Sequence, residues 1–264
     1  MKIAIHSVKT SWKGTVILLL AFSGLLFMVM SIYPNMKESL DMWADSLPGF
    51  ALSAFGRSGL DLSLVEGYLN VEFYQWGWVL TLGIYFAFIS SSLISKEIEN
   101  KTIDMLLSNP VSRARIVLEK FLGLVPAVIL MNVWIPLVIY GCLIHINETI
   151  DVTYLFYTHF ASVFYLCAVC ALGLLFSVIF DETRRANVLA IGVISGMYVI
   201  EILSSVSEKY ATIGKMSIIH YYDPGEILVH HLFSASDAVA LFFITAMLLA
   251  AAAIYFEKRD IAIS

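Results

Sequence analysis

Six long stretches without a charged side chain restrict the fold of this 264-residue chain more than any other feature. The stretches are residues 14–36, 73–95, 121–147, 152–180, 186–200 and 238–256. About 20 apolar residues cross the hydrocarbon core of a bilayer as one helix. Lipid offers no partner to an unpaired backbone group, so segments that cross it one by one are helical. The pattern therefore predicts an all-α polytopic membrane protein with six transmembrane helices.

The expected helix bounds follow the ends of these stretches, within a single transmembrane domain of residues 1–264. The spans are predicted at about residues 14–36, 73–95, 121–147, 156–180, 186–207 and 237–256. The fifth stretch is the shortest, and it reaches full length only if Glu201 lies near the membrane surface. Residues 37–72 and 208–236 are expected to be outer loops. Glycines and a proline divide the first loop into short amphipathic helices, and the second contains a turn at residues 223–225.

The composition favours a membrane protein and excludes other classes. Hydrophobic residues make up 59% of the chain and charged residues 14%, and the mean hydropathy is +0.84. In soluble domains about a quarter of the residues are charged. The net charge of -5 includes no long basic run, so nucleic acid is not expected as a partner.

The distribution of lysine and arginine predicts the orientation, because basic residues near span ends favour the cytoplasmic side. With the N-terminus inside, twelve of the 16 Lys and Arg residues fall in inner segments and the other four in outer segments. Both termini are therefore expected to be cytoplasmic, in a multi-pass protein of the cell (plasma) membrane. Residues 1–13 mix apolar side chains with lysines, which predicts a short interfacial helix before the first span.

The inner segment of residues 96–120 has the most informative sequence. Its first half has an apolar face at helical spacing, which predicts an amphipathic helix. That face comprises Ile98, Thr102, Met105 and Leu106. On another face, Glu97 and Lys101 are expected to pair at i,i+4. Pro110 ends this helix and begins a second one that leads into the third span.

This segment resembles the ABC-2 type permeases of ATP-binding-cassette transporters. The shared pattern is an acidic pair and a threonine after the second span, then two leucines, a proline and a Ser-Arg. The matching residues are Glu97, Glu99, Thr102, Leu106, Leu107, Pro110, Ser112 and Arg113. Residues 220–228 and 256–261 are also similar to the family. Asn100 and Lys101 depart from it, because a glycine is common there.

The resemblance implies the fold of an ABC-2 type exporter transmembrane domain, with an N-terminal interfacial helix and a cytoplasmic coupling helix. It implies that the eight matching residues contact a separate ABC ATPase subunit, present in two copies per complex. Leu106 and Leu107 would enter an apolar groove of that partner, and Glu97, Glu99 and Arg113 would set its orientation by charge. A second permease copy or a paralogue would complete the complex, which would export its substrate.

The substrate path is expected between the two permeases, lined by the second and fifth spans. Small or polar side chains offer a surface for it there. The residues are Ser90, Ser91, Ser92, Asn187, Ser195 and Gly196.

Catalytic motifs are absent from the sequence, including the G-x-x-x-x-G-K-[ST] loop that an ATPase needs. We therefore expect a permease subunit that is not an enzyme and has no cofactor of its own, with ATP and Mg²⁺ bound by the partner subunit. Two other functions stay open. One is a membrane-embedded enzyme whose site uses outer histidines and carboxylates, and the other is a membrane anchor of a cytoplasmic complex.

Two groups of residues have metal-binding side chains, although no metal site is predicted. Cys167 and Cys170 form a C-x-x-C in the fourth span, where cysteine also serves as a small apolar residue. His220, His230 and His231 lie in the last outer loop, where a hydrogen-bonded, solvated role is favoured. The substrate, and the choice between homodimer and heterodimer, stay open.

Overall fold

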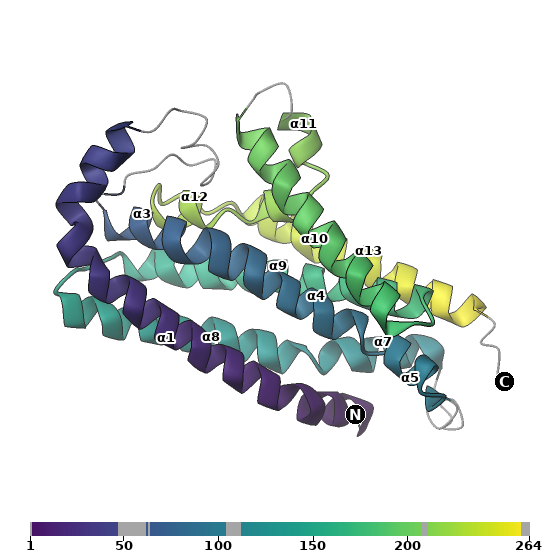
Figure 1. The fold of residues 1–264 in the computed structure, drawn as a ribbon. Helices are drawn as coiled ribbons and strands as arrows, with labels where there is room; N and C mark the ends of the chain where they lie inside the picture. The colour runs from purple at the N-terminus through teal and green to yellow at the C-terminus, as the bar shows by residue number, and fades with distance from the viewer. Residues whose placement is uncertain (1, 47–61, 63, 104–111, 207–210, 260–264) are drawn as a thin grey trace.

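The structure is a computed structural model that describes residues 2–46, 62, 64–103, 112–206 and 211–259. All regular structure in these residues is helical (Figure 1), which confirms the all-α class. The elements are α1 (Lys2–Ser46), α3 (Val65–Leu69), η1 (Asn70–Leu82), α4 (Gly83–Ser91), α5 (Ser95–Glu99), α7 (Arg113–Leu122), α8 (Val125–Ile146), α9 (Val152–Ile179), α10 (Thr183–Val206), α11 (Ala211–Gly214), η3 (Ile219–Tyr221), α12 (Pro224–Leu228) and α13 (Ala235–Lys258). Element η1 is a π-helix and η3 a 3₁₀ turn.

Among the described residues, six helical segments are long and apolar enough to cross a membrane, as predicted. They are Trp12–Lys37, Val65–Glu99, Arg113–Ile146, Val152–Ile179, Thr183–Val206 and Ala235–Lys258. Several of these segments extend past the uncharged stretches. The second begins at Val65 and the third at Arg113, because charged residues such as Arg, Glu and Lys are good helix formers and do not stop a helix.

The first helix differs from the expected division into an interfacial helix and a span. Helix α1 is continuous from Lys2 to Ser46, so it contains residues 1–13 apart from Met1, the first span and the start of the first loop. No proline precedes Pro34 in this helix, so nothing in the sequence separates residues 1–13 from the span. Figure 1 shows the last turns of α1 bending away from the rest, where Pro34 removes a backbone donor. Residues 47–61, where short loop helices were expected, lie outside the described residues.

Helix α9 is the central element of the bundle. It packs against α4, α8, α10 and α13. Of the residues in its most apolar 18-residue stretch 67% are buried, compared with 22% in the corresponding stretches of α10 and α13. Helices α4 and α9 approach each other closely at Gly173. A Cβ atom there would lie 2.0 Å from Ser90 Oγ and 2.8 Å from the carbonyl oxygen of Ala87. Small residues permit such close helix packing in membranes.

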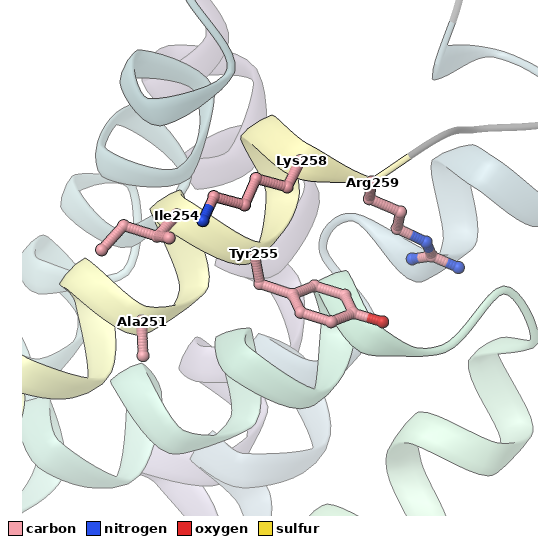
Figure 2. A pocket seen from close by; sticks show the side chains of 5 residues that line it. All are labelled: Ala251, Ile254, Tyr255, Lys258 and Arg259. Carbon is pink, nitrogen blue, oxygen red and sulfur yellow. The ribbon is translucent and has the colours of Figure 1, made fainter.

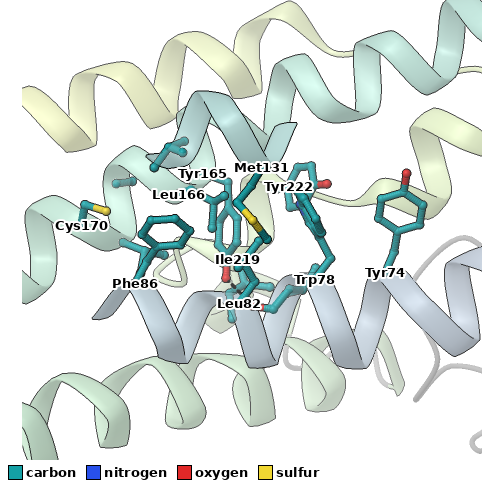
Figure 3. Packing of buried hydrophobic residues seen from close by; sticks show 14 of the residues in the cluster. Tyr74, Trp78, Leu82, Phe86, Met131, Tyr165, Leu166, Cys170, Ile219 and Tyr222 are labelled. Atoms are coloured by element: carbon teal, nitrogen blue, oxygen red, sulfur yellow. Dashed lines mark hydrogen bonds between the residues drawn. The ribbon is translucent and has the colours of Figure 1, made fainter. Parts of the chain in front are cut away.

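Buried aromatic side chains fill the space between η1, α4 and α9 (Figure 3). Trp78 and Tyr74 of η1 are fully buried, and their rings lie 6.4 Å apart. Tyr165 of α9 stacks on Tyr222 with ring centroids 5.1 Å apart, and its hydroxyl donates a hydrogen bond to the Val79 carbonyl at 2.7 Å. These rings join the second and fourth spans to the segment before α12.

Candidate functional site

The described parts of the segment predicted to couple, α5 and the start of α7, lie at one end of the bundle, together with the end of α13 (Figure 1). We call this the basic end, after Lys96, Arg113, Lys120, Arg185 and Lys258. The end with the α8–α9 connection is called the opposite end. The basic end corresponds to the predicted cytoplasmic side.

The first coupling helix is shorter than predicted. Helix α5 ends at Glu99, and Lys101 has a left-handed backbone with φ of 56°. The N–H of Lys101 bonds to the Ile98 carbonyl, and the N–H of Thr102 bonds to the Glu97 carbonyl at 2.9 Å. These two bonds form a Schellman motif, which terminates a helix. The expected continuous helix through Thr102 is therefore wrong, and the left-handed residue is at the place where the resembling family commonly has a glycine.

Glu97 pairs with a different lysine from the one predicted. The Lys120 ammonium of α7 contacts Glu97 Oε1, and the side chains are 4% and 21% exposed. The expected i,i+4 pair with Lys101 does not form, because the left-handed turn takes Lys101 off the helical face. The second oxygen of Glu97, Oε2, is buried and has no hydrogen-bond partner in the part of the chain that the structure describes. The Glu97–Lys120 pair connects the second span to the third.

Glu99 connects the same loop to α10. Its Oε2 accepts a hydrogen bond from the backbone N–H of Thr183 at 3.1 Å. Thr183 is the first residue of α10, where backbone N–H groups have no partner within the helix and a carboxylate is favourable. The end of the second span is thereby attached to the start of the fifth.

Arg113 connects α7 to the end of α13. Its guanidinium donates to the Phe256 carbonyl at 3.0 Å and to the Arg259 carbonyl, and lies 5.5 Å from the centre of the Phe256 ring. Arg259 in turn contacts the Val178 carbonyl and Asp181, just past α9. Figure 2 shows Arg259 just past the end of α13, where it is one of the residues that line a surface pocket. Arginine donors thus satisfy helix-end carbonyls in two spans.

The other predicted contact residues have local roles or lie outside the described residues. Ser112 caps α7, and its Oγ accepts from the Arg115 N–H at 3.3 Å. Thr102 is exposed, and its Oγ1 donates to the Glu97 carbonyl at 3.3 Å. Leu106, Leu107 and Pro110 lie outside the described residues.

The residues predicted to line a path differ in their contacts and in their burial. Ser91 and Ser92 both donate to Asn187 Oδ1, at 2.7 and 2.9 Å, so these three form one contact between α4 and α10. Ser90 is fully buried against α9, and reaching a path would require the α4–α9 contact to open. Ser195 is partly exposed and Gly196 is exposed, with no atom within 4 Å of a Cβ built there. The lining role stays a prediction.

A buried polar network in the spans was missed by sequence reasoning. Tyr74 Oη lies 2.9 Å from His159 Nε2, and His159 Nδ1 lies 3.3 Å from Asn132 Oδ1. Nearby, Trp78 Nε1 donates to Ser162 Oγ at 2.6 Å. The sequence did contain a clue to this network, namely a histidine and an asparagine inside otherwise apolar stretches. Polar groups at membrane depth are unfavourable in free energy, so where they occur they usually have a function.

In the part of the chain that the structure describes, the metal-binding side chains do not gather into one site. Among the described residues no group of three or more His, Cys, Asp or Glu could hold a metal ion. His220 pairs with Glu201 at 3.4 Å, whereas His231 stacks on Tyr154 with ring centroids 4.2 Å apart. The absence of a metal or cofactor from the function of this chain stays a prediction.

Comparison with known proteins gives one match. A family model described as ABC-2 family transporter protein matches residues 1–261, nearly the full chain. The searches of curated proteins and of solved structures found no match.

Proposed function

This chain belongs to the ABC-2 family of transporter proteins, and from that premise we propose that it transmits ATP-driven movements of a separate ATPase subunit to its own spans during export. It is a membrane transport component, and its described residues include six helices long and apolar enough to cross a membrane. The proposal adds two ATPase copies, a second permease copy or paralogue, and a plasma membrane location with cytoplasmic termini. The ATPase would dock at the loop of residues 96–120.

The observation that carries this proposal is the set of contacts around that loop. Glu97 is joined to Lys120, Glu99 to the first residue of α10, and Arg113 to the last turn of α13. Arg259 extends the chain of contacts to the end of α9. A displacement of the loop therefore acts on the second, third, fourth, fifth and sixth spans together. A separate ATPase subunit needs such a connection, because that subunit can move the spans only through a stiff element that is continuous with them.

The charged groups of the loop have a further consequence for docking. Glu97, Glu99 and Arg113 already have partners inside the chain, so a docking ATPase would meet a preorganised surface. Preorganisation lowers the ordering cost of binding. In this proposal the three residues hold the docking surface in place and also face the partner. The exposed Thr102 and Ser112 lie at the rim of that surface.

Site-directed crosslinking tests the docking position. With Cys142, Cys167 and Cys170 replaced by alanine, Thr102→Cys is joined by a short maleimide–succinimide reagent to lysines of the ATPase subunit purified with this chain. The matched control is Thr149→Cys, an exposed threonine in the α8–α9 connection at the opposite end. We expect an ATPase adduct with Thr102→Cys and none with Thr149→Cys. Copurification of the ATPase without an adduct at Thr102, or with one at Thr149, would overturn the docking position.

A further inference from the structure

An open pocket of about 520 Å³ lies along the end of α13, at the basic end of the bundle (Figure 2). Its lining residues are Ala251, Ile254, Tyr255, Lys258 and Arg259. Ligand pockets have volumes of roughly 300–1,000 Å³. Ile254 and Tyr255 are 55% and 42% exposed, whereas Ala252 and Phe256, on the packed face of the same helix, are fully buried. The pocket therefore opens away from the bundle, toward the surroundings of the last span.

The lining of the pocket changes from apolar to cationic along the axis of α13. Ala251 and Ile254 come first, the Tyr255 phenol follows, and Lys258 and Arg259 lie at the end. Residues 251–258 cover roughly 10 Å along an α-helix. A span end lies near the headgroup region of the bilayer. The order of side chains therefore matches that of a phospholipid, in which the acyl chain, the glycerol esters and the phosphate follow one another in the same direction.

Lys258 supplies a cation that no described carboxylate neutralises. In the described part of the chain Lys258 has no ion pair, whereas the pairs at this end include Arg115 with Glu119, Lys120 with Glu97, Arg185 with Glu182 and Arg259 with Asp181. Figure 2 shows the Lys258 side chain turned back along α13, with its ammonium beside Ile254. Helical side chains point toward the N-terminus, which at this end is the direction of the hydrocarbon. An ammonium held there needs an anion, because a lone charge is unfavourable near hydrocarbon.

Tyr255 and Arg259 form the other flank of the pocket. The Arg259 guanidinium contacts the Val178 carbonyl and Asp181, so it is held in place and its charge is balanced. The Tyr255 hydroxyl points to the same side as Arg259 in Figure 2, and no described residue forms a hydrogen bond with it. The pocket thus combines one unbalanced positive charge, one available hydroxyl and an apolar wall. This combination favours an amphiphile with an anionic head.

We propose that the pocket at the end of α13 binds an anionic phospholipid, whose phosphate pairs with the Lys258 ammonium and whose acyl chain lies along Ala251 and Ile254. The Tyr255 hydroxyl donates to a headgroup oxygen. Basic side chains near a membrane surface attract anionic lipids. The proposal requires only that the basic end lies at a membrane surface, so it does not depend on the ATPase subunit or on its docking position.

Photolabelling with two matched lipid probes tests the site. The probes are phosphatidylglycerol and phosphatidylcholine, each with the same diazirine-bearing acyl chain, so that they differ only in the headgroup. Each is added in trace amounts to the full chain in phosphatidylcholine nanodiscs, and labelled peptides are quantified by mass spectrometry. We expect phosphatidylglycerol to label the α13 peptide that contains Ile254 roughly fivefold more than phosphatidylcholine, the effect of one lysine on an anionic lipid.

Charge variants separate the pocket from general attraction to the basic end. Lys258→Gln should lower the labelling ratio at α13 to about 1, and Lys258→Arg should keep it, because a cation remains. The matched control is Lys96→Gln, which removes an exposed lysine at the same end outside the pocket and should leave the ratio unchanged. Ala251→Trp fills the apolar part and should reduce labelling by both probes. Size-exclusion profiles confirm that each variant is folded.

Several results would overturn the proposal. They are equal labelling by the two probes in the unmodified chain, an unchanged ratio in Lys258→Gln, and an equal fall in Lys96→Gln. Competition by inorganic phosphate at constant ionic strength would show that the pocket takes the free ion and not a lipid. A disulfide between two copies carrying Ile254→Cys in the cysteine-free background would assign the surface to a second copy, and loss of labelling on addition of the copurified ATPase would assign it to that subunit.

Discussion

The two ends of the bundle are held together by different interactions. At the basic end, charged side chains join helices that are far apart in sequence: Arg113 donates to carbonyls at the end of α13, and Glu99 accepts from the first N–H of α10. At the opposite end, stacked aromatic and imidazole rings make many of the contacts between segments. Tyr157 stacks on Phe233 with centroids 4.9 Å apart, and Tyr154 on His231.

This difference indicates where the protein is stiff and where it can rearrange. Hydrogen bonds that an arginine donates to a helix end, or that a carboxylate accepts from one, have narrow geometric requirements, so they fix the helices relative to one another. Stacked rings tolerate sliding better than these hydrogen bonds do, because the hydrophobic effect that holds them is not directional. We therefore expect the basic end to move as a unit, while changes in helix spacing occur toward the opposite end.

The largest expected effect is the loss of Lys120. Lys120→Met leaves the Glu97 carboxylate little water and no cation, since the two side chains are 4% and 21% exposed. Breaking a buried pair by removing one partner costs about 3–5 kcal/mol in the free energy of unfolding. Thermal and denaturant unfolding in one detergent measures it. The double variant Glu97→Leu with Lys120→Met should recover most of the loss, because no unpaired charge is left.

The matched control for this comparison is Lys37→Met at the opposite end. Lys37 pairs with Glu148 at 2.8 Å, but the side chains are 43% and 28% exposed. Exposed pairs contribute about 1 kcal/mol or less. Equal losses of stability in Lys37→Met and Lys120→Met would contradict the claim that the ends differ.

A smaller effect is expected from filling the α4–α9 contact in the half of α9 near the basic end. Gly173→Ala places a Cβ 2.8 Å from the Ala87 carbonyl oxygen, a backbone atom that cannot rotate away. Such overpacking costs about 1–3 kcal/mol. Gly77→Ala, in η1, meets no atom closer than 3.7 Å and should be tolerated. The unfolding midpoint of both variants decides this, and a stable Gly173→Ala would show that the two helices separate easily.

The sequence predicted the helices better than their contacts. Uncharged stretches are visible along the chain, so the number of spans followed from length alone. The partner of Arg113 could not be predicted in this way, because the Phe256 carbonyl is 143 residues away. Glu97 had a plausible local partner in Lys101, and only the left-handed turn shows that Lys120 takes its place. Polar residues in the spans, such as His159, gave a signal that charge counting ignores.

The smallest expected effect concerns the turn that ends α5, at the basic end. Lys101 has a left-handed backbone, which costs a residue with a Cβ about 1–2 kcal/mol. Lys101→Gly removes that cost and adds chain entropy to the unfolded state, so we expect a net gain of about 0.5–1 kcal/mol. Lys101→Ala is the control, since it removes the same charge and keeps the Cβ. If unfolding experiments show both variants equally stable, the charge of Lys101 and not its backbone would determine the stability of this turn, and the basic end would owe less of its stiffness to the Schellman motif.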